Sequence, residues 1–253
     1  MVAPIGIFDS GLGGISVWQA LHEALPNESL IYLGDGARCP YGARSRQEVR
    51  DFTFEAVERL LAEGCKMIVV ACNTATAVAI KELRECYPNV PFVGLEPAVK
   101  PAALTTKSGV IAVLATKRSL EGDHFRRAEE KYGSEVRILK AVGEGFVEAV
   151  ESNLEHSSET EAMVRRVVEP LVAQGADKLV LGCTHYPFLR SVIERVAGDE
   201  VEIIDSSEAV ARRVANLLDE NGIRAELSTV DYRFLTFADE AYAAKLRNKA
   251  LKK

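Results

Sequence analysis

Two cysteines, Cys72 and Cys183, stand at equivalent positions of a segment that occurs twice in this 253-residue sequence. Residues 57–72 and 168–183 align without a gap, and 7 of the 16 aligned positions are identical. Each copy has a helical pattern that ends at glycine, then a short apolar run, and then the cysteine. A reaction that needs one thiol on each side of its substrate would use such a duplication.

Both cysteines are followed by polar residues: Asn73 and Thr74 in the first copy, Thr184 and His185 in the second. The pattern places each cysteine at a strand-to-helix turn, where outward-pointing backbone N–H groups favour an anion. A thiol there ionises more readily than the ordinary cysteine, whose pKa is about 8.5. Either cysteine alone could be a small apolar residue at the end of a strand. The matched pair favours catalysis.

The other three cysteines, Cys39, Cys65 and Cys86, lack this setting, and we expect them to be structural. An odd number of cysteines argues against a disulfide framework. A zinc site would usually need two close pairs of cysteines or histidines, and only Cys183 with His185 is tightly spaced, so no metal site is expected.

A glycine-rich stretch, Asp9-Ser10-Gly11-Leu12-Gly13-Gly14, follows the first apolar run. It has neither the lysine of a phosphate-binding loop nor the spacing of a dinucleotide-binding loop. Its backbone amides could still bind a carboxylate, with the Ser10 hydroxyl as a further donor. Asp9 could pair with a ligand ammonium or orient a neighbouring thiol. A tight turn capped by Asp9 or Ser10 is the alternative interpretation.

The loop after the second apolar run contains Tyr41 and Gly42, and the Gly42 amide could contact a substrate. A simple turn would explain this Pro-Tyr-Gly sequence equally well. His185, two residues after Cys183, could protonate or orient a group at the second cysteine.

Short apolar runs alternate with helical patterns along the whole chain. Strands are predicted at 5–8, 30–33, 67–71, 92–95, 110–114, 136–141, 179–182 and 201–204, and helices at 16–25, 47–63, 75–86, 119–132, 145–153, 160–174 and 207–221. One more strand and a polar helix are predicted between 229 and 253. Strands without polar alternation indicate parallel sheets covered on both faces.

The fold class is therefore α/β, with two similar parallel-sheet domains related by pseudo-twofold symmetry. We expect residues 1–97 plus 208–253 to form the first domain and residues 98–207 the second, with Glu96–Pro101 as a crossing point. Ligands of open parallel sheets bind beyond the carboxyl ends of strands, where the unusual residues of this sequence fall.

The composition excludes several classes of function. Hydrophobic content of 47% and charged content of 27% are those of an ordinary globular protein. The formal net charge of −6 argues against nucleic acid as the main partner. Neither a membrane-spanning stretch nor a signal peptide is predicted, so we expect a cytoplasmic protein without a membrane partner.

Four motifs together resemble those of the glutamate racemases, within the aspartate/glutamate racemase family. They are Asp9–Gly14, Gly34–Gly42, Ala71–Thr76 and Gly182–Pro187, in the expected order and spacing. The resemblance implies cofactor-independent interconversion of L- and D-glutamate, which supplies D-glutamate for peptidoglycan, in a cleft between two α/β domains. It also leads us to expect a homodimer and no cofactor.

The resemblance further implies a role for individual residues. Cys72 and Cys183 would be the bases on opposite faces of the substrate Cα, assisted by Asp9 on one side and by His185 and Glu151 on the other. Substrate binding would involve Asp9, Ser10, Tyr41, Gly42, Asn73, Thr74, Thr184 and His185. Gly36 stands where a threonine is usual, and Glu148 replaces a proline, which leaves open whether Glu148 or Glu151 assists Cys183.

Other functions are compatible with the same fold. An aspartate or hydantoin racemase, or a decarboxylase with one working cysteine, would share it. A redox or thiol-transfer enzyme is disfavoured because the cysteines do not form a C-x-x-C pair. A non-catalytic amino-acid-binding protein would tolerate the loss of either cysteine, yet both are present. A turnover assay would distinguish an enzyme from such a binding protein.

Overall fold

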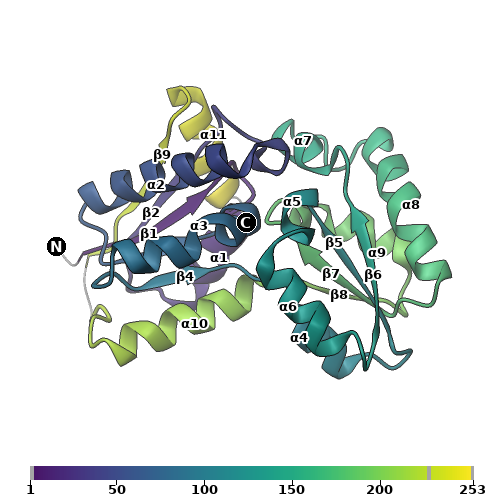
Figure 1. Cartoon of the computed structure of the whole chain (residues 1–253). Coiled ribbons are helices and arrows are strands. Elements are labelled where there is room, and N and C mark those ends of the chain that lie inside the picture. Colours follow the sequence, from purple (N-terminus) through teal and green to yellow (C-terminus); the bar gives the residue numbers. More distant parts are fainter. Residues whose placement is uncertain (1–2, 227–228, 252–253) are drawn as a thin grey trace. The chain divides into compact units, whose positions relative to one another are not determined.

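The computed structural model describes residues 3–226 and 229–251, in which strands and helices alternate (Figure 1). The strands are β1 (Ile5–Asp9), β2 (Leu30–Gly34), β3 (Met67–Val70), β4 (Phe92–Gly94), β5 (Val110–Ala115), β6 (Arg137–Val142), β7 (Lys178–Gly182), β8 (Glu202–Ile204) and β9 (Tyr232–Thr236). The α-helices are α1 (Ile15–Ala24), α2 (Arg46–Ala62), α3 (Asn73–Cys86), α4 (Val99–Thr105), α5 (Lys117–Leu120), α6 (Asp123–Tyr132), α7 (Phe146–Glu151), α8 (Ser158–Ala173), α9 (Arg190–Ala197), α10 (Ser207–Glu220) and α11 (Glu240–Leu251). Two short 3₁₀ helices are η1 (Tyr41–Ala43) and η2 (Tyr186–Leu189).

The chain forms two compact units. Unit 1 comprises the described residues of Met1–Leu95 and Ser207–Lys253, and unit 2 comprises Glu96–Ser206. Unit 1 has a five-stranded sheet in the order β4-β3-β1-β2-β9, and unit 2 a four-stranded sheet in the order β6-β5-β7-β8. All neighbouring strands are parallel. The predicted class of two parallel-sheet α/β domains is confirmed.

The first four strands of unit 1 have the same topology as the four strands of unit 2. In unit 1 the first strand, β1, lies between β2 and β3, and in unit 2 the first strand, β5, lies between β6 and β7. The duplicated sequence supplies β3 and β7, so Cys72 and Cys183 follow corresponding strands. The direction of winding reverses between β1 and β3 and between β5 and β7. Such switch points are where open α/β sheets bind ligands.

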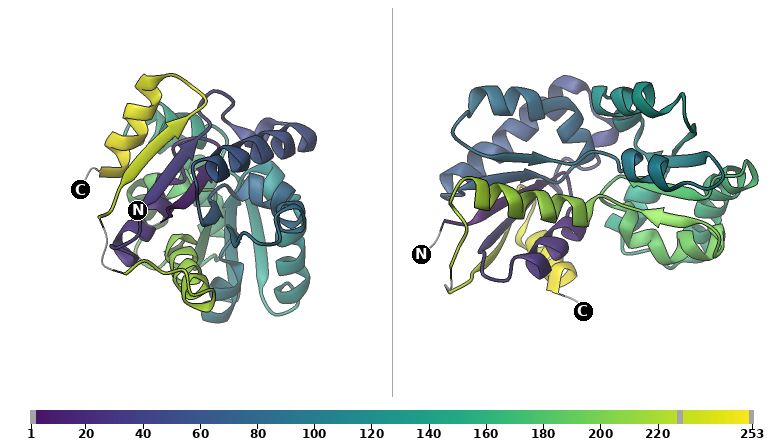
Figure 2. Two further views of the ribbon diagram at one scale, coloured as in Figure 1. Left: turned by 90° about the vertical axis from the view of Figure 1, so that its left-hand side faces the viewer. Right: turned by 90° about the horizontal axis from the view of Figure 1, so that it is seen from below.

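Helices cover both faces of the sheet in unit 1. Alternate strand residues such as Phe8, Leu33 and Val70 pack in one cluster with Val57 of α2 and Ala79 of α3. Helix α1 packs against α10 and α11. Helix α10 runs below the sheet in Figure 1 and lies toward the viewer in the right-hand view of Figure 2. Because both faces are covered, the strands are buried and apolar rather than alternating.

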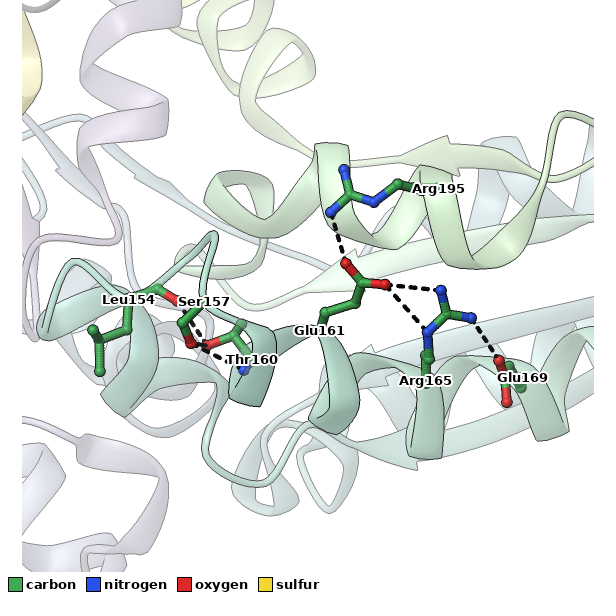
Figure 3. Close-up of polar contacts among 7 residues, drawn as sticks. All are labelled: Leu154, Ser157, Thr160, Glu161, Arg165, Glu169 and Arg195. Atoms are coloured by element: carbon green, nitrogen blue, oxygen red, sulfur yellow. Dashed lines mark hydrogen bonds and ion pairs between the residues drawn. The ribbon is translucent and has the colours of Figure 1, made fainter.

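In unit 2, Val99 of α4 and Phe125 of α6 pack with Val113 of β5 and Val180 of β7. Helices α8 and α9 pack against each other. Figure 3 shows the polar contacts at their surface, where Glu161 of α8 pairs with Arg165 at 2.8 Å and with Arg195 of α9 at 3.1 Å. Exposed pairs of this kind stabilise a protein by less than about 1 kcal/mol each. The stability of unit 2 therefore comes mainly from its apolar cluster.

Three elements differ from the prediction. The helix expected over 119–132 is divided into α5 and α6, because Thr116 caps α5 and the backbone of Gly122 is extended. Helix α4 begins within the segment predicted as a crossing point, and α9 was not predicted. Among the described residues, none of the helices combines the length and apolar character needed to span a bilayer.

Candidate active site

The first candidate thiol, Cys72, caps the N-terminus of α3. Its sulfur accepts a hydrogen bond from the Ala75 N–H at 3.5 Å, and the thiol contacts the Ser10 hydroxyl at 3.5 Å. The N–H donor and the positive end of the helix stabilise negative charge on the sulfur. Cys72 thus lies at the strand-to-helix turn that the sequence predicted.

The glycine-rich loop after β1 is fixed from two sides. Asp9 is fully buried, and its Oδ2 accepts a hydrogen bond from the Gly11 N–H at 3.0 Å. The Tyr32 hydroxyl donates to the Gly11 carbonyl at 2.8 Å. At Gly14 a Cβ atom would lie 2.6 Å from the Cβ of Asp9, so only glycine fits there. The loop places Ser10 beside Cys72. Tyr32 was not predicted, because in the sequence it is one more residue of a buried strand.

Asn73 and Thr74 occupy the first turn of α3, and both are buried. Within the described parts of the chain, the Asn73 Nδ2 has no hydrogen-bond partner and is shielded from solvent. A buried donor without a partner costs about 1–3 kcal/mol. A ligand carboxylate next to Asn73 would remove that cost.

Tyr41 begins η1, and its side chain is only 1% exposed. Its hydroxyl donates to Asp35 Oδ2 at 2.6 Å. Burial, the Asp35 charge and this hydrogen bond raise the pKa of Tyr41 well above its ordinary value. A substrate contact of Tyr41 and Gly42 stays a prediction. At the start of η1 their backbone N–H groups have no intrahelical acceptor and could make it.

The second candidate thiol, Cys183, ends a chain of polar groups in unit 2. Its sulfur lies 3.9 Å from His185 Nδ1, and His185 Nε2 lies 2.7 Å from Glu151 Oε1 on α7. His185 is 2% exposed, and Thr184 beside it is also buried. A carboxylate, an imidazole and a thiol in this order can move a proton to or from the sulfur. Glu151 is therefore the glutamate that contacts His185, whereas Glu148 is exposed.

Cys183 does not lie at the start of an α-helix, and this part of the prediction is wrong. A turn and the 3₁₀ helix η2 follow it, and α9 begins only at Arg190. The reason is the sequence Tyr186–Leu189, in which Pro187 takes the first turn of η2. The polar partner of this sulfur is therefore an imidazole, whereas at Cys72 it is a hydroxyl and a helix N–H.

Tyr186 connects the segments that carry His185 and Glu151. Its hydroxyl donates to the Gly143 carbonyl at 3.3 Å, and its ring packs edge-on against Phe146 of α7 at 5.3 Å. Burial, followed by the charge of Cys183, raises the pKa of Tyr186. This role was not predicted, because the contact joins residues 43 positions apart and depends on tertiary packing.

Comparisons with known proteins assign the chain to a family. Residues 5–214 match the family described as Asp/Glu/Hydantoin racemase. The chain is 47% identical over 248 residues to the glutamate racemase of Deinococcus radiodurans, covering 96% of this chain and 84% of that relative. The chain belongs to the Asp/Glu/hydantoin racemase family. It is an isomerase, an amino-acid racemase.

Solved structures of racemases agree with this assignment. Glutamate racemase RacE1 of Bacillus anthracis has a TM-score of 0.87 at 34% identity, over 98% of this chain and 94% of that one. The Escherichia coli glutamate racemase, solved with L-glutamate and the activator UDP-MurNAc-ala, has a TM-score of 0.84 at 30% identity, over 96% and 92% of the two chains.

The remaining cysteines of this racemase lie in other surroundings. Burial and the neighbouring charge of Glu63 raise the pKa of Cys65 to about 12, which keeps its thiol protonated. Cys86 is exposed near the end of α3, and Cys39 is half-buried. Within either unit, the described residues contain no group of three histidine, cysteine or acidic side chains placed to hold a metal ion.

Proposed function

We propose that this racemase interconverts L- and D-glutamate without a cofactor, and that Cys72 and Cys183 are its two bases. The observation that carries the proposal is the placement of one cysteine after the corresponding strand of each sheet, at the switch point where a ligand would bind. Each thiol has polar partners of its own, as an acid–base group requires.

The chemistry needs two groups of one kind. One cysteine, as thiolate, removes the Cα proton, and the other, as thiol, returns a proton to the opposite face. After one turnover the first cysteine is the thiol and the second is the thiolate. The reverse reaction uses the same two groups in opposite roles. Because the product mirrors the substrate, two similar bases suit the reaction. A sequence duplication supplies such a pair.

The surroundings of each cysteine suggest how it is assisted. On the Cys183 side, Glu151 would hold His185 in the orientation that exchanges a proton with the sulfur. On the Cys72 side, Ser10 and the Ala75 N–H contact the sulfur, and Asp9 would assist through the loop that it shapes. The positive end of α3 and the Asn73 amide favour a substrate carboxylate, and such donors also stabilise charge that develops in the transition state.

Glutamate is the proposed substrate because the relatives of high identity bear that name and the E. coli structure holds L-glutamate. The residues proposed to bind it are Asp9, Ser10, Tyr41, Gly42, Asn73, Thr74, Thr184 and His185. The D-glutamate formed would enter peptidoglycan. A homodimer and a cytoplasmic location remain predictions from the sequence.

Proton NMR in D₂O tests the proposal. With L- or D-glutamate and the purified protein, the Cα–H signal should disappear while the optical rotation decays to zero. We expect the Cys72→Ala and Cys183→Ala variants to lose racemisation while keeping their fold by circular dichroism. Cys86→Ala, which changes an exposed cysteine, is the matched control and should retain full turnover. Full turnover by either site variant would refute the two-base assignment.

A substrate panel decides between the proposed activity and its nearest alternative. Exchange with aspartate but not with glutamate would move the assignment to an aspartate racemase. Exchange without inversion would indicate that only one cysteine works. The absence of exchange with both amino acids, together with binding of either, would identify an amino-acid-binding protein instead.

A further inference from the structure

The loop between β2 and α2, residues 35–45, contains a buried carboxylate that the mechanism above does not use. Asp35 directly follows β2 and has no exposed surface. Its backbone N–H donates to the Asp9 carbonyl at 3.0 Å, which ties the start of the loop to the end of β1. Its side chain turns into the loop rather than toward solvent.

Asp35 Oδ2 accepts two hydrogen bonds from within this loop. One comes from the Tyr41 hydroxyl at 2.6 Å and the other from Arg38 Nε at 2.6 Å. The second oxygen, Oδ1, is buried and has no partner among the described residues. A buried carboxylate is costly unless it is paired, so Asp35 stabilises the one loop conformation that brings both donors to it.

Arg38 connects this carboxylate to the surrounding scaffold. Its guanidinium lies 4.2 Å from the ring centre of Phe52 on α2 and 4.6 Å from that of Phe237. It also pairs with Glu55 of α2 at 2.5 Å. Stacking and two ion pairs leave the guanidinium little freedom.

The C-terminal part of the chain covers the same loop. At Gly36 an added Cβ would overlap the ring of Tyr242 on α11, so a larger residue has no room there. Phe237 contacts Arg38 and Tyr242 contacts Gly36, so the loop is held by packing against the C-terminal part of the chain as well as by hydrogen bonds.

The hydroxyl of Tyr41 has a single proton to donate, and it donates that proton in the hydrogen bond to Asp35 Oδ2. With 1% of its side chain exposed, Tyr41 acts as an anchor for η1 and offers a ligand only its backbone. The loop then presents N–H donors, from Tyr41 and Gly42, which suit an anionic group such as a carboxylate.

We infer that Asp35 is a positioning residue: through Tyr41 and Arg38 it holds residues 35–45 in the conformation that binds a substrate carboxylate. The inference rests on the proposed function of this loop in glutamate binding. A group that only shapes a binding loop affects ground state and transition state alike, so its loss raises KM and leaves kcat in place.

The test compares Asp35→Asn and Tyr41→Phe with Tyr87→Phe as a matched control. Tyr87 also donates its hydroxyl to a carboxylate, Glu58 at 3.3 Å, but on the exposed surface of unit 1. We expect Asp35→Asn to raise the KM for glutamate about tenfold, because it weakens both hydrogen bonds to the charged carboxylate. Tyr41→Phe removes one of these bonds and should raise the KM about threefold or more. In both variants kcat should change less than about twofold. Tyr87→Phe should leave both constants unchanged.

Two results would overturn the inference. One is a fall in kcat at unchanged KM, which would assign Asp35 to the chemical step. The other is unchanged kinetics with a lowered melting temperature, which would make the cluster merely structural. If Asp35→Asn does not fold, Tyr41→Phe, which removes one oxygen atom, still decides the question.

The proposed function is tested separately, by wild-type exchange of the glutamate Cα–H. If the wild type shows none, amide hydrogen exchange of residues 35–45 still tests the cluster. Unchanged protection of that peptide in both loop variants would refute the positioning role on its own, whereas faster exchange than in Tyr87→Phe would sustain it.

Discussion

Replacing Glu151 by glutamine tests whether the polar chain in unit 2 assists Cys183. The substitution keeps the shape of the side chain and removes its charge. Glu151 Oε1 lies 2.7 Å from His185 Nε2, within the range of charge-assisted hydrogen bonds. Bonds of this kind contribute about 1.5–3 kcal/mol.

If this interaction is made when His185 carries the proton, its loss slows turnover. The stated energy corresponds to a decrease of about 10- to 150-fold in kcat/KM. L- and D-glutamate have equal free energies in water, so the equilibrium constant of racemisation is unity. The decrease must therefore be the same whether the reaction starts from the L or the D enantiomer.

The assay follows circular dichroism of each enantiomer under initial-rate conditions, with Glu148→Gln as the matched control. Glu148 lies on the same helix, α7, and is exposed, so its replacement should change kcat/KM less than about twofold, as surface substitutions do. A loss in Glu148→Gln equal to that in Glu151→Gln would refute the reasoning. So would a kcat/KM for Glu151→Gln within about threefold of the wild type.

Three further predictions concern unit 1. Gly14→Ala should reduce activity and destabilise the protein by about 1–3 kcal/mol in urea unfolding, because the new Cβ would lie 2.6 Å from the Asp9 Cβ. Lys66→Met should lower the free energy of unfolding by about 3–5 kcal/mol, measured by urea unfolding, because it leaves the buried Glu28 without the ammonium that lies 2.7 Å away. An unchanged urea midpoint would contradict this. Stability should also fall as the pH rises from 9 toward 12, since the unfolded Cys65 thiol ionises with a pKa near 9.0 while the folded one stays protonated up to about 12, and Cys65→Ala should flatten that part of the pH profile.

The sequence predicted the alternation of strands and helices well because the strands are buried on both faces. Short apolar runs such as Met67–Val70 then stand out between amphipathic helical patterns. Its errors fall where local signals conflict. The patterns of α5 and α6 run together unless Gly122 is taken as a break, and α9 was missed because it follows the proline-containing η2.

The positions of the candidate site residues were predictable where these residues stand at the end of a strand or just after it. The positions of Cys72, Asp9 and Cys183 depend only on the end of β3, β1 or β7, and parallel strands place their carboxyl ends at one edge. What each side chain contacts was not predictable in the same way. Tyr41 was expected to contact a substrate, and that contact stays a prediction, but the hydrogen bond from its hydroxyl to Asp35 was not predicted.

By itself, the sequence determined the α/β class, the duplicated cysteine segment and the family resemblance, since periodicity and motif spacing are local properties of the chain. Tertiary structure alone decided that Glu151 rather than Glu148 pairs with His185, a residue 34 positions away. That choice depends on how α7 is rotated as Phe146 packs against Tyr186. Two glutamates three residues apart occupy neighbouring positions on a helix, and only the packing of its buried face selects which one points inward.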